Sequence, residues 1–256
     1  MKTTIVKISL SIILLLFSCS SDDDYTNSAS PPTELYIPKQ IDVIYGNNNQ
    51  RTCLIEYNDA NQISNLNFQY NNIDDGSYNI TYSNGKINQV TKGESLQYTF
   101  LYTNNILSSI QLVNSSNSNS FDITYDSDNN IYTLGSSSVF YFDSSDNLTR
   151  IVSGDIERSL SFTNPNASEG IFSTSHVPLH LIFILSSIEF ETLYYLSSKQ
   201  ISEASVTYDG GFQNSSFYDY ELDNNDKIIG FKIDNDWGAV MRTDQISIVY
   251  QLLTTE

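Results

Sequence analysis

The sequence has few basic residues and no long hydrophobic run. Its 12 Lys and Arg residues stand against 30 Asp and Glu, which gives a formal net charge of −18. A chain this acidic is repelled by phosphate backbones, so nucleic acid is not expected as a partner. The most apolar run, ISLSIILLLF from Ile8 to Phe17, is about half the length that a membrane-spanning helix needs, roughly 20 residues. It therefore predicts a secretory signal and not a membrane-spanning anchor.

Signatures of catalysis are also missing. The sequence contains no G-x-S-x-G, no HExxH, no phosphate-binding loop and no Cys-His nucleophile pattern. We therefore predict no catalytic residue, no metal site and no cofactor. Asp126, Asp128 and Asn130 have the spacing of a calcium loop, but Ile131 and Ser137 stand where such a loop needs Gly and Glu. Because similar polar clusters fill the other turns, we interpret this one as a turn.

The two histidines and the acidic pairs are also interpreted as structural features and not as sites. His176 and His180 are four residues apart, but Pro178 lies between them and no third ligand is near, so we assign them to the start of a helix. The acidic pairs, Asp155 with Glu157 and Glu189 with Glu191, each flank an apolar residue, a pattern typical of a solvated face.

The N-terminus predicts a lipoprotein signal peptide over residues 1–18. Lys2 and Lys7 supply its basic start, and the apolar run leads into Leu-Phe-Ser and then Cys19. These last four residues resemble a lipobox, whose cysteine receives diacylglycerol, so Cys19 is the predicted site of lipid attachment. Each buried methylene contributes roughly 0.8 kcal/mol, so several acyl chains on one cysteine hold a protein durably on a membrane.

The residues after Cys19 predict where the protein is displayed. Ser20 to Asp24 (SSDDD) resembles the acidic signal that sends Bacteroidetes lipoproteins to the cell surface. We therefore expect an outer-membrane lipoprotein exposed on the cell surface, with the periplasmic face as the alternative. Residues 19–39 are polar and contain proline, which predicts a flexible tether. Residues 40–256 have uniform composition and are expected to form a single domain.

The second cysteine is expected in the core. With Cys19 acylated, Cys53 has no partner for a disulfide within the chain. Alternation along the segment TCLIEY places Cys53 on the same strand face as Ile55 and Tyr57, opposite Glu56. We interpret Cys53 as a small buried hydrophobe and not as a reactive thiol.

One pattern recurs six times and predicts the fold. Each copy has a strand end with two aromatic or aliphatic residues, an Asn/Asp-rich turn of four or five residues, and the start of a new strand. The copies begin at Ile55, Ile80, Phe100, Ile123, Phe140 and Tyr220. Asn and Asp tolerate left-handed backbone conformations and hydrogen-bond their own turn, so they can replace the scarce glycine. Because each hairpin leads straight into the next strand, the pattern predicts an antiparallel meander.

The predicted fold class is all-β, with about 14 to 16 strands counted between the turns. A twisted sheet of that length must curl, split or close, so we expect an open barrel or shell. The repeats stop between residues 164 and 200, where PLHLIFILSSIEFETLYYL from Pro178 to Leu196 shows a helical spacing of apolar residues. We predict a helical insertion near 178–197, with Pro178 at its first position, that plugs the mouth of the sheet through its apolar face.

Two known families resemble parts of this pattern. The segments IEYNDANQI, ITYDSDNNI and YFDSSDNLTRI resemble the tyrosine-aspartate repeats of shell-forming Rhs-type proteins, although only Gly85 supplies the expected turn glycine. The whole arrangement is similar to a family of Bacteroidetes lipoproteins of unknown function. It shares the lipobox, the hairpins, an Asn-Pro segment before a Leu-rich helix, and Tyr-Leu-Ser-Ser-Lys at 195–199. This resemblance covers nearly all of the mature chain and implies a porin-like fold without catalytic residues.

Three classes of function remain open. The chain is a non-catalytic binding or structural module for a glycan or an envelope protein, a hydrolase of extracellular glycan or peptide with a site built from scattered loops, or a pore. Transmembrane strands need roughly 9 to 11 residues and a lipid-facing apolar side. The strand Ser77–Ser83 is shorter, and Asn79, Thr81 and Ser83 make one of its faces polar. These features favour the module.

A single candidate ligand contact can be named. Trp237, the only tryptophan of the chain, lies in the turn-like segment DNDWG from Asp234 to Gly238. Its ring has the shape to stack on a sugar, or it covers the end of the sheet.

Overall fold

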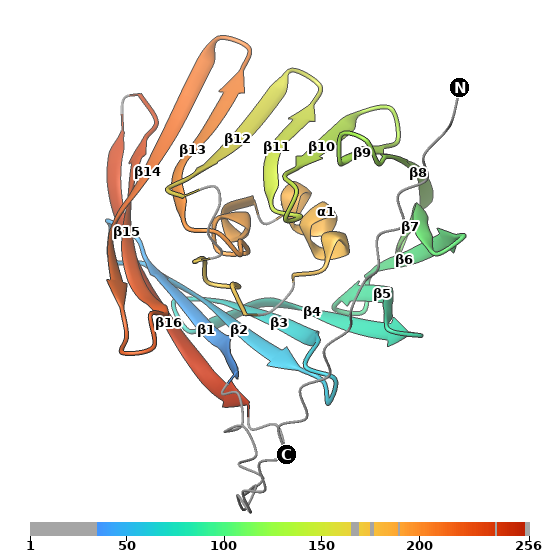
Figure 1. Ribbon diagram of the computed structural model, residues 1–256. Helices are drawn as coiled ribbons and strands as arrows, with labels where there is room; N and C mark the ends of the chain where they lie inside the picture. The colour runs from blue at the N-terminus through green and yellow to red at the C-terminus, as the bar shows by residue number, and fades with distance from the viewer. Residues whose placement is uncertain (1–34, 165–168, 175–176, 189, 239, 254–256) are drawn as a thin grey trace, which may run out of the picture.

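Sixteen antiparallel strands form one closed barrel in this computed structural model, which is drawn in Figure 1. The structure describes residues 35–164, 169–174, 177–188, 190–238 and 240–253. Each strand pairs with its neighbours in the chain, and β1 pairs with β16 to close the sheet. The predicted all-β meander with a helical insertion is confirmed.

The strands follow one another with few interruptions. They are β1 (Leu35–Ile44), β2 (Gln50–Tyr57), β3 (Ile63–Tyr70), β4 (Ile73–Ser83), β5 (Lys86–Lys92), β6 (Leu96–Thr103), β7 (Ile106–Asn114), β8 (Ser118–Asp126), β9 (Ile131–Leu134), β10 (Ser138–Phe142), β11 (Leu148–Ser153), β12 (Ile156–Phe162), β13 (Ile201–Tyr208), β14 (Gly211–Leu222), β15 (Ile228–Asp236) and β16 (Met241–Leu253). The predicted signal peptide, Cys19, His176 and Glu189 lie outside the described residues. Strand β1 begins at Leu35, within the segment 19–39 that the sequence predicts as a tether.

The two ends of the barrel differ in what they carry. Leu35 at the start of β1 pairs with Leu253 at the end of β16. We call this end proximal and the opposite end distal. Because neighbouring strands run antiparallel, the turns after even-numbered strands lie at the proximal end. The turns after odd-numbered strands, including the β1–β2 and β15–β16 connections, lie at the distal end.

Asn and Asp shape the turns as the sequence predicts. Asn61, Asp146 and Asp226 have φ angles of 58°, 59° and 58°, in the left-handed region that few other side chains tolerate. The first residue of these turns also caps them, since Asp143 Oδ1 accepts hydrogen bonds from the backbone N–H groups of the residues two and four positions later. Asn58 makes the same pair of contacts.

Tyrosines at the proximal ends of four strands join neighbouring strands. Each donates a hydrogen bond from its hydroxyl group to a backbone carbonyl oxygen near the start of the preceding strand, at 2.5 to 2.8 Å. The pairs are Tyr57 with Pro38, Tyr82 with Ile63, Tyr102 with Ile87, and Tyr220 with Ile201. Burial, with a smaller contribution from Tyr102, raises the pKa of Tyr82 to about 12, so its hydroxyl remains a donor at neutral pH.

Replacing Tyr82 with phenylalanine is expected to lower the free energy of unfolding by about 1 kcal/mol, because the carbonyl oxygen of Ile63 loses a hydrogen-bond donor. Urea denaturation measures the change. Tyr70→Phe, at a residue that is 41% exposed, is the control and should change stability by less than about 0.5 kcal/mol. Equal effects of the two substitutions would contradict this role of the hydroxyl.

The insertion between β12 and β13 fills the barrel. It contains the helix α1 (Leu179–Ile188) and the 3-10 helix η1 (Phe190–Tyr194), and both lie inside the ring of strands in Figure 1. The consecutive residues from Leu181 to Leu185 are all buried, so α1 is covered on all sides and not along one apolar face as the spacing predicted. Phe183 packs edge-on against Phe140 of the wall, with ring centres 4.7 Å apart.

The C-terminal end of the insertion is fixed to the β10–β11 turn. Lys199 Nζ lies 2.7 Å from Asp143 Oδ2, with side-chain exposures of 6% and 20%. Asn147 of the same turn accepts hydrogen bonds from the backbone N–H and the hydroxyl group of Ser198, at 2.9 and 2.8 Å. Because the lysine of this pair is buried and the carboxylate is partly buried, the pair couples the position of the insertion to the stability of the barrel.

Because of this charge pair, we expect the folded protein to lose stability in acid. Burial by itself raises the pKa of Asp143, but the hydrogen bonds from Lys199 and from the backbone of Asn147 and Ser145 outweigh it and hold the pKa below its ordinary value of 3.8. The folded state therefore gains stability from the carboxylate above the pKa of the unfolded chain, and that stability is lost as the pH falls through the folded pKa. Urea midpoints measured from pH 6 to pH 2 should fall less in Asp143→Asn than in the unchanged protein. Parallel curves for the two proteins would refute this contribution.

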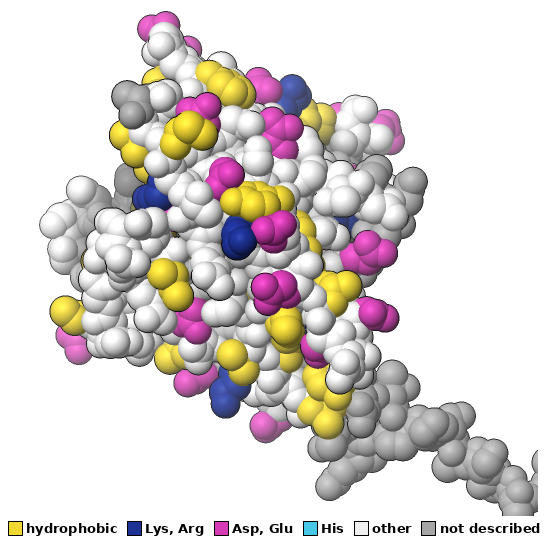
Figure 2. Space-filling view, turned by 90° about the vertical axis from the view of Figure 1, so that its left-hand side faces the viewer, with side chains coloured by type: hydrophobic (Ala, Val, Ile, Leu, Met, Phe, Trp, Pro, Cys, Tyr) yellow, Lys and Arg dark blue, Asp and Glu magenta, His cyan; other side chains and the backbone are white. Residues whose placement is uncertain are grey.

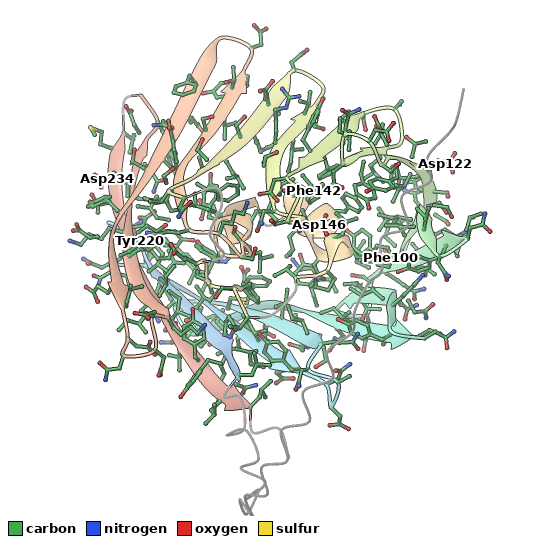
Figure 3. All side chains as sticks on the ribbon, viewed as in Figure 1. Phe100, Asp122, Phe142, Asp146, Tyr220 and Asp234 are labelled. Carbon is green, nitrogen blue, oxygen red and sulfur yellow. The ribbon has the colours of Figure 1, made fainter. Side chains whose placement is uncertain are left out.

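Side chains alternate across the barrel wall. On β4, Tyr78 and Ile80 are buried in the interior, whereas Asn79 and Thr81 are exposed on the outside. Cys53 is buried, as the alternation in its strand predicts. In Figure 3, side chains such as Phe100 and Phe142 point into the barrel and Asp122 and Asp234 lie on its outer side.

Strand lengths differ from the prediction. β4 has 11 residues, longer than the segment Ser77–Ser83 expected from the sequence, and β16 has 13. Seven of the sixteen strands have 9 or more residues, which is the length of membrane-spanning ones, whereas the other nine are shorter, as the sequence argument against a pore expects. Among the residues that the structure describes, no helix has the length and apolarity to cross a membrane.

Candidate binding site at the distal end

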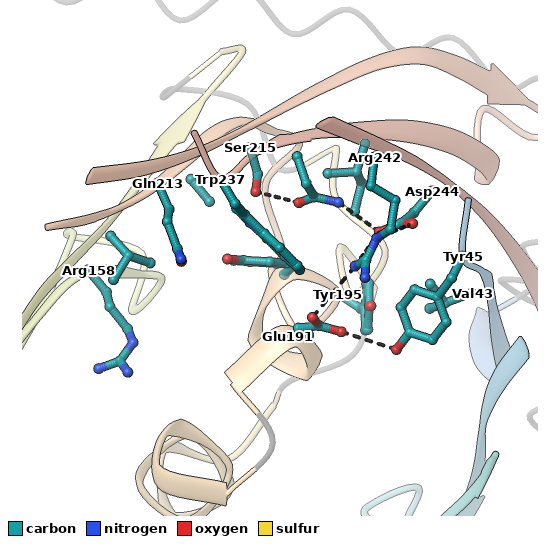
Figure 4. A pocket seen from close by; sticks show the side chains of 15 residues that line it. Val43, Tyr45, Arg158, Glu191, Tyr195, Gln213, Ser215, Trp237, Arg242 and Asp244 are labelled. Carbon is teal, nitrogen blue, oxygen red and sulfur yellow. Dashed lines mark hydrogen bonds and ion pairs between the residues drawn. The ribbon is translucent and has the colours of Figure 1, made fainter. Parts of the chain in front are cut away.

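A pocket of about 160 Å³ opens at the distal end of the barrel, between the wall and η1 (Figure 4). Strands β12 to β16 supply most of the wall, the residues at the end of β1 complete it, and η1 contributes Glu191 and Tyr194. A cavity of roughly 150 Å³ accommodates benzene in an engineered protein. This pocket is therefore large enough for one six-membered ring.

The inward-facing side of the wall changes from apolar to polar toward this pocket. In β16 the inward positions are Ile248 and Ile246 and then, at the distal end, Asp244 and Arg242. In β14 the order is Phe217, then Ser215 and Gln213, and in β15 Ile233 is followed by Asn235. Over the last residues of these three adjacent strands, polar inward-facing side chains take the place of the apolar ones of the core. Such a change suits a site for a polar ligand.

Arg242 lies between two aromatic rings. Its guanidinium carbon is 4.7 Å from the ring centre of Tyr45 and 4.6 Å from that of Trp237. Its Nε and Nη2 atoms each approach an oxygen of Asp244 at 2.8 Å. A guanidinium group held by a two-point ion pair stacks well on aromatic faces. These contacts fix the indole ring at the edge of the pocket.

Asp244 is the buried anchor of this arrangement. It is 3% exposed and, besides Arg242, accepts hydrogen bonds from the backbone N–H of Gly46 at 3.1 Å and from Asn235 Nδ2 at 2.7 Å. Asn235 in turn accepts a hydrogen bond from Ser215 at 2.6 Å. A Cβ atom at position 46 would lie 2.9 Å from Arg242 Cγ, so only glycine fits there. Both oxygens of Asp244 are occupied, and its role is to orient its neighbours.

Glu191 projects from η1 toward the same cluster. The hydroxyl group of Tyr45 donates a hydrogen bond to Glu191 Oε2 at 3.1 Å, and Arg242 Nη2 lies 3.8 Å from Glu191 Oε1. The Glu191 side chain is 37% exposed, so it is partly solvated as the sequence interpretation expects, and η1 also places it in the lining of the pocket. Burial and then the charge of Glu191 raise the pKa of Tyr194 to about 12, so that hydroxyl stays protonated at neutral pH.

Arg158 and Gln213 lie on the other side of the indole ring from Arg242 in Figure 4. Burial lowers the pKa of Arg158 below its ordinary value, although an arginine remains charged at neutral pH. The charged residues that line the pocket are Arg158, Arg242, Glu191 and Asp244, and their formal charges cancel. The pocket is therefore neutral overall in a chain with a net charge of −18.

The other sequence candidates have structural contacts. Asp126 accepts hydrogen bonds from the backbone of Asp128 at 3.0 Å and from Asn129 at 2.8 Å, within its own turn. His180 Nε2 lies 2.6 Å from the hydroxyl oxygen of Tyr102. Within the described part of the chain, no group of three or more His, Cys, Asp or Glu residues is placed to hold a metal ion. Trp237 does lie at the pocket, and its contact with a ligand stays a prediction.

Fold and site together describe a filled sixteen-stranded β-barrel with a polar pocket at one end. A porin-like protein from Bacteroides uniformis ATCC 8492 has a similar structure, with a TM-score of 0.52, 9% sequence identity and coverage of 87% of this chain and 98% of that one. A porin-like protein from Bacteroides vulgatus ATCC 8482 aligns with a TM-score of 0.45, 12% identity and coverage of 84% and 98%. No protein-family model and no curated protein matches the sequence. At this identity the first similarity shows a shared porin-like fold.

Proposed function

We propose that this chain is a lipid-anchored, non-catalytic binding module of the bacterial envelope. The observation that carries the proposal is the filled barrel whose distal end opens into a neutral pocket with aromatic walls. The lipobox-like segment at Cys19 and the Bacteroides origin of a structural neighbour support an envelope location. Surface display follows from the acidic residues after Cys19.

The geometry of the chain supports an outward-facing pocket. Cys19 stands 16 positions before Leu35 in the sequence, and β1 begins with Leu35 at the proximal end of the barrel. Lipid on Cys19 therefore holds the proximal end near the membrane, while the distal pocket faces away from it. A binding site on the outer envelope needs this orientation.

The interior and exterior of the barrel argue against a pore. The lumen is occupied by α1 and η1, whose residues pack against the wall. A membrane-spanning barrel needs an outer apolar band about 25 Å tall. Figure 2 shows instead a face where hydrophobic side chains are scattered among polar and acidic ones. The polar outer positions of β4 and β16, such as Thr81 and Gln245, repeat this pattern.

The carboxylates of the pocket support binding in preference to hydrolysis. General acid–base catalysis needs a carboxyl group that can exchange a proton with the substrate. Asp244 is buried and its two oxygens accept several hydrogen bonds, and Glu191 is held by Tyr45 and Arg242. Both carboxylates thus serve to position Arg242 between the aromatic rings.

A ligand screen with product analysis tests the proposal. The purified lipoprotein in detergent is applied to arrays of bacterial and plant oligosaccharides and to envelope protein extracts, and the same ligands are incubated with it and analysed for cleavage. Saturable binding of an intact ligand is the expected result. Turnover that Glu191→Gln abolishes would establish the hydrolase alternative and overturn the proposal, as would stable ion currents across a planar bilayer.

A further inference from the structure

We infer that the distal pocket takes one neutral sugar ring, the end residue of a glycan chain. This inference rests on the proposed binding function and names its ligand class. Three properties of the described residues carry it: the size of the pocket, its charge balance and the exposed indole ring at its edge.

Size and shape limit the ligand to a single ring. The pocket has about 160 Å³ and is bounded below by η1 and on the sides by the barrel wall. Trp237, 36% exposed, supplies a rigid flat surface because Arg242 holds its ring at 4.6 Å. The C–H face of a pyranose is apolar and matches such a surface, while its hydroxyl groups point sideways. Flat aromatic faces combined with a few polar groups are typical of sites for small polar molecules.

Charge balance selects a neutral ligand. The two arginines and two carboxylates of the pocket cancel, and Arg242 is already paired with Asp244 and Glu191. A charged ligand would bring an excess charge into a partly buried site, which costs free energy unless an opposite charge meets it. The acidic exterior of the chain further repels anions.

The remaining polar groups fit hydroxyl recognition. Gln213 offers an amide that both donates and accepts hydrogen bonds, and Tyr194 also lines the pocket. Glu191, which also lines the pocket, provides acceptor oxygens. Sugars present alternating donors and acceptors from each hydroxyl, so a mixed set of this kind satisfies them without net charge.

The only tryptophan of the chain allows a direct test. Fluorescence of Trp237 in the full-length lipoprotein is titrated with glucose, galactose, mannose and N-acetylglucosamine, and with glucuronic acid and glucosamine as charged counterparts. We expect a saturable change in emission with at least one neutral sugar, with a dissociation constant on the order of 1 mM. Each charged counterpart should bind at least about fivefold more weakly.

Variants separate the pocket from other surfaces. Calorimetric titration of the best neutral sugar should show a loss of affinity of about tenfold or more in Trp237→Ala. Gln213→Ala, at a wall position that leaves the Arg242 cluster intact, should also weaken binding. The control is Phe212→Ala, because Phe212 is 58% exposed and lies next to Gln213 but outside the pocket lining, and it should leave affinity within about twofold.

The other possible outcomes distinguish a wrong ligand class from a wrong function. The inference is wrong if a charged sugar binds more tightly than the neutral ones. It is also wrong if both Trp237→Ala and Gln213→Ala leave sugar binding unchanged. In either case the proposed binding function is not contradicted. If no monosaccharide binds but a ligand from the wider screen does, the inference also falls and the proposed function survives. If neither the sugars nor the wider screen yields a ligand, both the inference and the proposed function are wrong.

Discussion

The Cys19→Ala variant is expected to leave the membrane fraction and to appear in the soluble fraction. Removal of the thiol eliminates the acyl chains, each of whose buried methylenes contributes roughly 0.8 kcal/mol to membrane binding. The outward positions of β4 and β16 are mostly polar and offer no comparable contact with lipid. Fractionation of cells followed by immunoblotting measures the shift, and metabolic labelling with a fatty acid reports the acylation itself.

The second cysteine gives the matched control for this experiment. Cys53 is buried in the barrel core, so Cys53→Ala should reduce stability slightly but leave acylation and sedimentation unchanged. If Cys19→Ala still sediments with membranes, the barrel or the insertion makes its own contact with lipid. In that case the pore interpretation regains support.

The Lys199→Met variant is expected to lower the free energy of unfolding by about 3 kcal/mol. Methionine fills a similar volume but leaves the carboxylate of Asp143 without its buried cation, and removal of one member of a buried pair is strongly destabilising. Net stabilities of folded domains are only about 5–15 kcal/mol, so the urea midpoint should shift visibly. The insertion should also become more accessible to protease, because Lys199 fixes its C-terminal end.

An exposed pair with nearly the same geometry is the control. Lys232 Nζ lies 2.9 Å from Asp219 Oδ2, but the two side chains are 45% and 59% exposed. Solvent screens this pair, and Lys232→Met should cost less than about 1 kcal/mol. A loss of the same size in both variants would mean that burial is not what gives the Lys199 pair its importance.

Much of the fold can be predicted from the sequence because the signals for its strands and turns are local. A strand end, an Asn/Asp turn and the next strand lie within a few residues of one another, and Asn61 and Asp146 adopt the left-handed conformations expected for such turns. The closure of the barrel and the burial of α1 on all sides could not be predicted from the sequence. They depend on pairing between β1 and β16 at opposite ends of the chain and on the fit of the insertion to the lumen.

The pocket could be predicted only in part, because its residues come from distant segments. Tyr45, Glu191 and Arg242 meet only after the barrel has closed. One signal was present: Arg242 and Asp244 occupy the same period-two phase as Ile246, which places charges on an inward face. Charged residues on the same strand face as core residues indicate a cavity lined by polar side chains. The sequence prediction named only Trp237 and did not include Arg242 and Asp244.

If the distal pocket binds its ligand without converting it, the ligand must be recovered intact after binding. Equilibrium dialysis of the purified lipoprotein against the best ligand of the screen, followed by mass spectrometry of the ligand, measures this. We expect one ligand bound per barrel, recovered unchanged, and binding reduced about tenfold or more in Trp237→Ala. Recovery of cleaved ligand, or undiminished binding when both Trp237 and Gln213 are replaced by alanine, would contradict this expectation.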